Sequence, residues 1–276
     1  MLKLFTLLAA ALAVSGPQIE VYKTVGGTKL TAHVFRPVGA SSHRRPAVVL
    51  FHGGGWAAGS PEWVYDAAKR YASYGAVAVA AEYRLSDQKT VTPLDAMTDA
   101  RDIVRWMRRN AAELGIDADK IAAYGVSAGG HLAASLATFD DGASGEPSAV
   151  PNAMVLISPA VSLGQDGWFQ KLLLGRAAVA GISPDQHVGK RMPPTAIFIG
   201  AADTLTPLLG AKNYCNRITA LGGACELHVY EGVGHLFTRK LDNQEDDFDP
   251  DPKAAGNARV EGDLFLAKRG FLSTSR

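Results

Sequence analysis

The sequence predicts an α/β fold with a mostly parallel eight-stranded sheet, an antiparallel N-terminal hairpin and helices on both faces. Three observations predict it: an early hairpin pattern, a series of short apolar runs after it, and helical patterns between those runs. Strands that alternate with helices form parallel sheets covered on both faces. In such sheets ligands bind at the carboxyl ends of the strands.

The first two strands form the hairpin. Residues 21–25 and 29–35 are strand-like, and Gly26-Gly27 between them is a hairpin signal. Later runs are short and apolar, which is typical of strands buried on both faces. They are residues 47–51, 76–81, 121–126, 153–158, 196–200 and 225–230.

The clearest helix spans residues 93–113. One of its faces is apolar at helical spacing. This face contains Ala96, Ala100, Ile103, Val104 and Met107. The opposite face is charged, and we expect it to be solvated and to carry local ion pairs. It contains Asp99, Arg101, Asp102, Arg105, Arg108 and Arg109.

Two segments have weaker patterns. Residues 162–192 contain several glycines, so we expect an irregular insertion or partial cap near the site. Residues 243–252 are acidic and polar, which is typical of a surface loop. A final helix is expected over residues 252–270.

The composition is that of a globular protein. The chain has 276 residues, of which 47% are hydrophobic and 20% charged, which excludes disorder, collagen and coiled coil. The net charge of +1 gives no indication of a nucleic-acid partner. Two cysteines are too few for a zinc site of several thiolates. The length fits a single domain over residues 17–276.

The N-terminal segment predicts export. A lysine precedes an apolar run at residues 4–14, which is shorter than the roughly 20 residues needed to cross a bilayer. This run fits the central region of a secretory signal peptide. We expect a signal peptide over residues 1–16, cleaved after residue 13 or 16, and a secreted or periplasmic chain with no membrane attachment. The alternative is a buried N-terminal helix.

Export makes the two cysteines a candidate disulfide. Cys215 lies in a predicted helix and Cys225 at the start of the next strand. An oxidising compartment permits a bridge between them. The alternative is a pair of reduced, buried thiols that act as small apolar side chains.

The strongest motif is a G-x-S-x-G pattern at residues 125–129, centred on Ser127. It lies between the predicted strand 121–126 and a helical stretch. A serine on such a sharp turn is held exposed in a strained conformation, where it can act as a nucleophile. The flanking glycines remove Cβ atoms that would collide with the neighbouring strand and helix. The alternative is a chance match in a chain with 29 glycines.

Residues 52–56 read His-Gly-Gly-Gly-Trp and follow a predicted strand. Consecutive glycines let backbone N–H groups point into a pocket, where an acyl-transfer enzyme needs donors for the oxyanion. We assign that role to the N–H groups of Gly53, Gly54 and Ala128. The alternative is a Gly-rich turn or a phosphate loop, which the absence of a G-x-x-x-x-G-K-[ST] pattern disfavours. His52 is interpreted as structural.

A serine nucleophile needs a base, and the base needs an acid that orients it. His235 directly follows the last predicted strand, and Asp203 follows the strand before it. Both therefore lie at carboxyl ends of strands. The chain order Ser127, Asp203, His235 is typical of this topology. The alternative for Asp203 is a helix N-cap.

Other candidates are weaker. His228 lies inside a predicted strand, and His131 lies in a predicted helix, where local packing is expected. Asp166 and Asp185 are fallbacks for the acid. The segment 82–84, Glu-Tyr-Arg, is interpreted as an ion-paired loop that braces the oxyanion turn.

Three tryptophans are candidate walls of an acyl or sugar pocket. They are Trp56, Trp63 and Trp168. A lone tryptophan is more often part of a core, so core packing is the alternative for each.

These residues together resemble the α/β-hydrolase superfamily. The motifs at residues 52–55 and 125–130 are similar to its hormone-sensitive-lipase-like and feruloyl/acetylxylan esterase-like branches, and Val126 makes the second branch nearer. Leu236 departs from many relatives, which have glycine there, and no segment is as large as a lipase lid. The resemblance implies the α/β-hydrolase fold and the triad named above. It implies no metal and no cofactor.

The activity implied by the resemblance is that of a secreted serine esterase that works through an acyl-enzyme. The substrate class implied is acetylated or feruloylated plant polysaccharide or oligosaccharide. Alternatives are a broad-specificity short-chain carboxylesterase, a serine peptidase and a non-catalytic binding protein on the same scaffold. The chain is too short for the propeller domain of a prolyl-oligopeptidase-like peptidase, and non-catalytic relatives typically lack a triad residue.

Overall fold

The computed structural model describes residues 16–39, 41, 43–139, 145–164, 166–246 and 248–273. The expected signal peptide lies outside these residues except for Gly16. Within the described residues, no helix is both long and apolar enough to cross a membrane. Because residues 1–15 lie outside the described part of the chain, the signal peptide and its cleavage site stay predictions.

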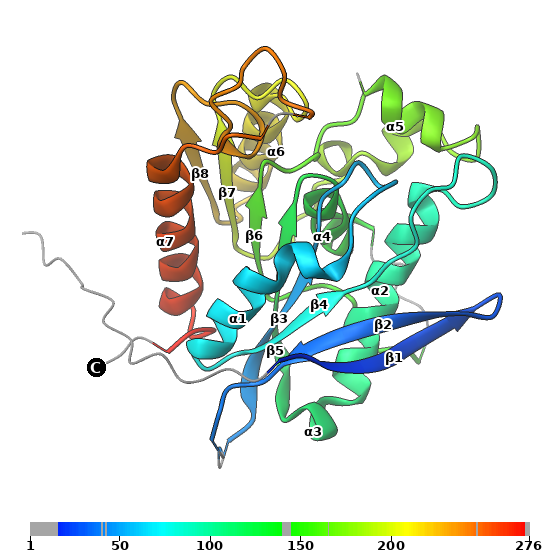
Figure 1. Cartoon of the computed structure of the whole chain (residues 1–276), viewed down its shortest axis with the longest axis vertical. Coiled ribbons are helices and arrows are strands. Elements are labelled where there is room, and N and C mark those ends of the chain that lie inside the picture. The colour runs from blue at the N-terminus through cyan, green and yellow to red at the C-terminus, as the bar shows by residue number, and fades with distance from the viewer. Residues whose placement is uncertain are drawn as a thin grey trace, which may run out of the picture.

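The centre of the molecule is an eight-stranded sheet with the strand order β1-β2-β4-β3-β5-β6-β7-β8 (Figure 1). The β1–β2 and β2–β4 pairs are antiparallel, and all other pairs are parallel. This confirms the predicted fold. The strands are β1 Gln18–Val25, β2 Thr28–Phe35, β3 Arg45–Phe51, β4 Val77–Ala81, β5 Ile116–Val126, β6 Ala153–Ile157, β7 Thr195–Gly200 and β8 Cys225–Tyr230.

Helices cover both faces of the sheet (Figure 1). The α-helices are α1 Tyr65–Ser73, α2 Pro93–Arg109, α3 Ala111–Leu114, α4 Ala128–Thr138, α5 Gly167–Leu172, α6 Leu208–Ala220 and α7 Pro252–Lys268. Short 3-10 helices span Pro61–Val64, Val179–Ile182, Pro184–Gln186 and His235–Phe237. The long α2 begins at Pro93, where Thr92 before it and Asp95 in the first turn form a capping box.

Two apolar clusters hold the helices to the sheet. On β3, Val49 and Phe51 belong to the cluster that contains α2, α4 and α6, whereas Val48 and Leu50 belong to the cluster that contains α1 and α7. Successive side chains of a strand point to opposite faces. This alternation explains why the run is apolar at every position, as a strand covered on both faces requires.

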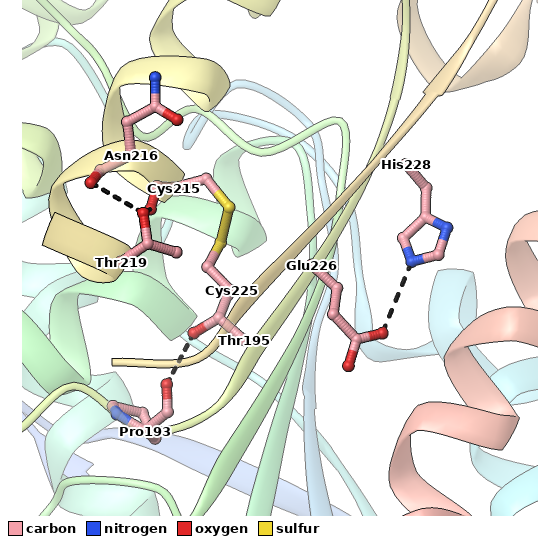
Figure 2. Close-up of a disulfide and its surroundings, with 8 residues drawn as sticks. All are labelled: Pro193, Thr195, Cys215, Asn216, Thr219, Cys225, Glu226 and His228. Carbon is pink, nitrogen blue, oxygen red and sulfur yellow. Dashed lines mark hydrogen bonds and ion pairs between the residues drawn. A yellow bond between two sulfur atoms is a disulfide. The ribbon is translucent and has the colours of Figure 1, made fainter. Parts of the chain in front are cut away.

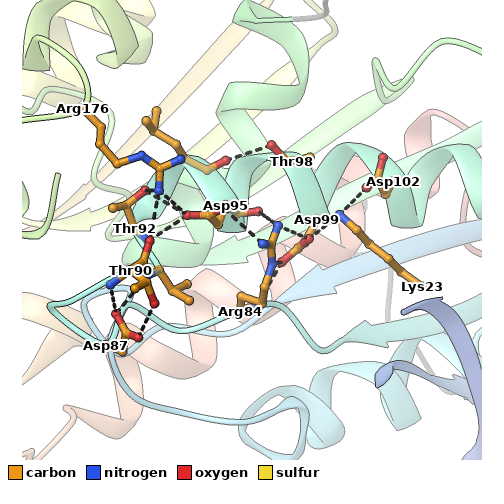
Figure 3. A network of polar contacts seen from close by, with 12 residues as sticks. Lys23, Arg84, Asp87, Thr90, Thr92, Asp95, Thr98, Asp99, Asp102 and Arg176 are labelled. Carbon is orange, nitrogen blue, oxygen red and sulfur yellow. Dashed lines mark hydrogen bonds and ion pairs between the residues drawn. The ribbon is translucent and has the colours of Figure 1, made fainter. Parts of the chain in front are cut away.

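The predicted solvated face of the helix at residues 93–113 is wrong for Asp99 and Arg105, whereas Arg109 is exposed as expected. Asp99 is 0% exposed, and its carboxylate binds Lys23 Nζ of β1 at 2.6 Å and Arg84 Nε at 2.8 Å (Figure 3). Arg105 of the same face is buried as well. The hairpin and the segment after β4 pack over this side of α2, so its charges pair with distant residues. A buried carboxylate requires such partners.

The predicted helix is also interrupted. It ends at Arg109, and a short separate helix, α3, follows after Asn110. Gly115 then takes a left-handed conformation with φ of 70°, which ends α3 and lets β5 begin at Ile116.

The segment 162–192 is an irregular insertion, as predicted, with α5 and two 3-10 helices. Arg176 anchors it to the start of α2. Its Nη1 lies 3.1 Å from Asp95 Oδ2 and donates to the Thr90 carbonyl oxygen at 3.1 Å (Figure 3). Because Asp95 also binds Arg84, this anchor belongs to the same polar network as Asp99.

A disulfide joins Cys215 of α6 to Cys225 at the start of β8 (Figure 2). The bridge spans a sequence separation of 10 residues. It ties a helix to the edge strand of the sheet, where β8 has a partner on one side only.

Replacing both cysteines by alanine should lower the free energy of unfolding. Closing a loop of this length stabilises a protein by about 3 kcal/mol on the chain-entropy model. Urea unfolding of the wild type and the double variant, each with and without reductant, measures the effect. Reductant should lower the stability of the wild type only; equal stability of all four samples would contradict a stabilising bridge.

Candidate active site

Ser127 lies on the sharp turn between β5 and α4, with φ of 52° and ψ of −117°. A non-glycine residue with positive φ is strained and persists only where its surroundings hold it. The Ser127 N–H donates to the Ile157 carbonyl oxygen of β6 at 2.9 Å. The turn is thereby fixed to the neighbouring strand.

The two flanking glycines of the motif are required by packing. A Cβ atom on Gly125 would lie 2.3 Å from the Gly129 carbonyl oxygen. A Cβ atom on Gly129 would lie 2.2 Å from the Phe51 carbonyl oxygen. The strand, the helix and the end of β3 therefore approach each other at van der Waals limits, as the motif predicted.

The structure brings Ser127, His235 and Asp203 together. His235 Nε2 lies 3.0 Å from Ser127 Oγ, and His235 Nδ1 lies 2.9 Å from Asp203 Oδ2. The side chains of His235 and Asp203 are almost completely buried. A hydroxyl, an imidazole and a carboxylate in this order can move a proton from the hydroxyl and hold the resulting imidazolium.

Asp203 is held in place by the loop that follows it. Its Oδ1 accepts the backbone N–H groups of Leu205 at 3.1 Å and Thr206 at 2.8 Å. The Thr206 hydroxyl lies 2.8 Å from Oδ2. The helix α6 begins only at Leu208, so Asp203 is not its N-cap. These bonds leave Oδ2 facing the imidazole.

Gln244 is a residue of the site that the sequence interpretation missed. It is 5% exposed, although it lies in the segment predicted as a surface loop. Its Oε1 accepts the His235 N–H at 2.8 Å and the Thr204 N–H at 3.2 Å, and its Nε2 donates to the Ala202 carbonyl oxygen at 2.9 Å. One side chain therefore joins the loop of the acid to the loop of the base.

Replacing Gln244 by alanine should damage both stability and the site. The change leaves buried backbone groups without partners, which costs about 2 kcal/mol. We expect kcat to fall as well, because the two loops lose their common support. Chemical unfolding and ester hydrolysis measure the two effects. Asn243→Ala, at an exposed neighbour, is the matched control. Equal behaviour of the two variants would contradict this role for Gln244.

The predicted oxyanion loop lies against the nucleophile. A Cβ atom on Gly53 would lie 3.3 Å from Ser127 Cβ. Gly54 has φ of 108°, and a side chain there would collide with the Ala58 carbonyl oxygen at 2.2 Å. Ala128 is the first residue of α4, so its N–H has no acceptor within the helix. Gly53 and Ala128 therefore adjoin Ser127, and Gly54 lines the same pocket as Ser127.

His52 braces this loop and is buried. Its Nδ1 lies 2.6 Å from the Gly53 carbonyl oxygen, and burial lowers the pKa of its ring. The Tyr83 hydroxyl donates to the His52 carbonyl oxygen at 2.9 Å. The segment 82–84 therefore reaches the oxyanion loop through its tyrosine. Its arginine pairs instead with the acidic residues of α2.

A pocket of about 730 Å³ opens at Ser127 and His235. Its rim carries exposed apolar side chains, among which Trp63 is 63% exposed. The rim side chains are Trp63, Trp168, Leu205 and Phe248. Two acidic residues, Asp166 and Glu245, also line the pocket, and burial raises the pKa of the Asp166 carboxyl.

The predicted tryptophan walls differ from each other. Trp56, Trp63 and Trp168 all line the pocket. Trp56, however, is buried, and its ring packs against Phe169 and His131. Trp63 and Trp168 are exposed, so part of each indole surface is accessible to a ligand.

The weaker candidates lie in other surroundings. Asp166 caps α5 by accepting the Phe169 N–H, and Asp185 binds two serine hydroxyls of the insertion. His228 stacks on Phe198 in the sheet, and His131 is completely buried in α4. Among the described residues, no group of three or more His, Cys, Asp or Glu side chains could hold a metal ion.

Comparisons with known proteins agree with this geometry. The BD-FAE family model matches residues 33–153. Thermogutta terrifontis esterase 2, in a structure phosphoramylated by tabun, superimposes with a TM-score of 0.83 and 34% identity over 94% of this chain and 97% of that chain. The propionate-bound structure of the same esterase gives a TM-score of 0.81 and 33% identity over 95% of this chain and 97% of that chain.

Curated relatives match over a shorter region. An arylesterase of Saccharolobus solfataricus is 37% identical over 109 residues, and carboxylesterase NlhH of Mycobacterium tuberculosis is 38% identical over 105 residues. The matches cover 39% and 37% of this chain. The chain spans about a third of the length of these curated relatives, at 34% and 32%. The similarity to the Thermogutta esterase, in contrast, extends over almost the whole length of both chains. This chain therefore belongs to the esterase family of the α/β-hydrolase fold.

Proposed function

We propose that this protein is a serine carboxylic-ester hydrolase that works through an acyl-enzyme. The observation that carries the proposal is the chain of contacts from Ser127 Oγ through His235 to Asp203, at 3.0 and 2.9 Å, beside the glycine loop. The arylesterase and carboxylesterase relatives and the Thermogutta esterase support the same reaction class.

The reaction proceeds in two halves. Ser127 Oγ attacks the ester carbonyl while His235 Nε2 takes its proton, and the oxyanion forms beside the N–H groups of Gly53, Gly54 and Ala128. Asp203 stabilises the imidazolium. The C–O bond to the alcohol breaks as His235 returns the proton to the leaving oxygen. Water then attacks the acyl-enzyme with the same base, which releases the acid and restores the serine.

For the substrate we propose acylated polysaccharide or oligosaccharide. The aromatic rim, Trp63 and Trp168, supports this choice, since aromatic rings pack against the C–H face of a sugar. The carboxylates of Asp166 and Glu245 line the same pocket and can accept hydrogen bonds from hydroxyl groups. Among the described residues around the pocket, no segment is as large as a lipase lid, which also suits a bulky substrate.

Export of the mature chain is part of the proposal. The N-terminal apolar run supports it, and so does the disulfide, because such bridges form in oxidising compartments. N-terminal sequencing of protein recovered from the periplasm or medium tests it. A chain that begins after residue 13 or 16 is the expected result, and an intact N-terminus in the cytoplasm would overturn it.

A second candidate function is a broad short-chain carboxylesterase. The specific observation in its favour is that the Thermogutta esterase has structures with propionate and with butyrate bound. The same triad serves both functions, and only the preferred alcohol differs. A non-catalytic protein has less support, because Ser127 and Asp203 both lie within hydrogen-bond distance of His235. A peptidase has less support because the similar proteins are esterases.

The test measures acetate release from acetylated xylan beside hydrolysis of an aryl acetate, with Ser127→Ala as the control. Release from both substrates by the wild type alone is the expected result. Hydrolysis of the aryl acetate alone would favour the broad carboxylesterase. No activity on either ester, together with correct folding, would overturn the esterase proposal.

A further inference from the structure

A buried histidine lies one helical turn beyond the nucleophile and outside the triad. His131 of α4 is 0% exposed, and its backbone N–H donates to the Ser127 carbonyl oxygen at 3.2 Å. Its Nδ1 accepts the Trp56 Nε1–H at 3.1 Å, and its Nε2 lies 3.2 Å from the Ile182 carbonyl oxygen. With Nδ1 as the acceptor, Nε2 carries the proton and donates to Ile182. The tautomer is thus set by its partners.

The ring is suited to accept a hydrogen bond at neutral pH. Complete burial lowers the pKa of His131 to about 4. The ring contacts are aromatic or neutral: Trp56 lies 5.5 Å and Phe169 5.3 Å from it between ring centroids, and the Ser135 hydroxyl lies 3.3 Å from Nε2.

Trp56 ends the oxyanion loop in a strained conformation. It follows Gly53, Gly54 and Gly55 directly and has φ of 61°, which is rare for an aromatic residue. Such a conformation persists when surrounding contacts over-determine it. Here the contacts are Phe169, 4.6 Å away between ring centroids, and the bond to His131. The Trp56 carbonyl oxygen also accepts the Ser86 backbone N–H at 2.7 Å.

The insertion holds the loop from the other side. The Trp168 Nε1–H donates to the Gly55 carbonyl oxygen at 3.0 Å. Two indole N–H groups, one in the loop and one in α5, therefore fix the glycine turn to the nucleophile helix and to the insertion. His131 is the point where loop, helix and insertion meet, since it binds Trp56 and Ile182 at once.

We propose that His131 is a positioning residue for the oxyanion loop, which accepts the Trp56 indole N–H and thereby fixes the Gly53 and Gly54 N–H groups beside Ser127. This inference rests on the proposed esterase function. Catalysis depends on donors that are aimed before charge develops. A displacement of about 1 Å from a remote mutation can cost about 100-fold in rate. Loss of the bond should therefore act on the chemical step more than on substrate binding.

The experiment uses three single variants of the full chain and the double variant that combines His131→Leu with Trp56→Phe. His131→Leu removes the acceptor, Trp56→Phe removes the donor and keeps an aromatic ring, and His131→Asn keeps an oxygen close to the position of Nδ1. Trp106→Phe is the matched control, since it alters a tryptophan of α2 that packs against Tyr22 of β1. Hydrolysis of an aryl acetate gives kcat and KM, and thermal unfolding gives the stability of each variant.

We expect His131→Leu and Trp56→Phe each to lower kcat about 10- to 100-fold with KM within about two-fold, the pattern for an interaction made only in the transition state. His131→Asn should retain most of the wild-type kcat. The double variant should be no slower than the worse single variant, because both changes delete one bond. Trp106→Phe should leave kcat unchanged.

Equal losses of kcat in His131→Asn and His131→Leu would overturn the proposal, and so would variants that lose only thermal stability. If His131→Leu does not fold, Trp56→Phe and His131→Asn still decide. A wild type that neither hydrolyses the ester nor is labelled by an organophosphonate would refute the proposed function itself. An active wild type matched by all variants would refute the role of His131 alone.

Discussion

Replacing Ser127 by alanine should lower kcat for an aryl acetate by about a million-fold, the loss that follows removal of a serine nucleophile from such a triad. The hydroxyl that lies 3.0 Å from His235 Nε2 is the atom that would form the acyl-enzyme. Without it, acylation has no nucleophile. The remaining activity reflects only the oxyanion donors and substrate binding. Steady-state hydrolysis measures the loss.

Covalent labelling gives an independent measurement of the same prediction. An organophosphonate should add one phosphonyl group to the wild type and none to the Ser127→Ala variant. Sarin phosphonylates the similar Thermogutta esterase, so the reagent class is appropriate. Ser86→Ala, which alters another buried serine, is the matched control and should be labelled normally. Labelling of the Ser127→Ala variant would place the nucleophile elsewhere.

Replacing Asp203 by asparagine should lower kcat about 10,000-fold, as loss of the orienting carboxylate does in serine enzymes. The contacts of Asp203 explain why kcat should fall. Oδ1 accepts the N–H groups of Leu205 and Thr206, so the asparagine oxygen must take that position. Its NH₂ group then faces His235 Nδ1 at the position of Oδ2. The proton moves to Nε2, which can no longer accept the proton of Ser127.

The measurement for this variant is kcat on the same aryl acetate beside thermal unfolding. Asp185→Asn is a matched control, because Asp185 is also buried and binds two serine hydroxyls away from the triad. The control should change stability and keep kcat. An Asp203→Asn variant with near-wild-type kcat would show that another group orients His235.

Local patterns predicted much of the fold and the site. Strands such as residues 47–51 are apolar at every position because both faces are covered, and that pattern needs no knowledge of distant residues. The glycines of the motif around Ser127 are explained by nearby atoms, since a Cβ atom on Gly125 or Gly129 would clash with backbone at the strand, the turn and the helix. Asp203 and His235 follow from chain order once the strands are placed.

What the sequence could not predict depends on contacts between distant segments. Asp99 looked solvated because the partner that covers it, Lys23, lies 76 residues away on the hairpin. Gln244 lies in a polar stretch that is typical of a loop, and its role arises only because that stretch folds back onto the ends of β7 and β8. A buried glutamine and a buried aspartate have no local signature.

The attachment of the insertion has a consequence for protein engineering. Exchange of residues 162–192 is an obvious way to change substrate preference, since the segment borders the pocket and is joined to α2 by Arg176. Trp168, however, binds the glycine turn itself. A graft that omits this tryptophan would alter the catalytic rate together with selectivity. Libraries in this segment therefore need that position held constant while its neighbours vary.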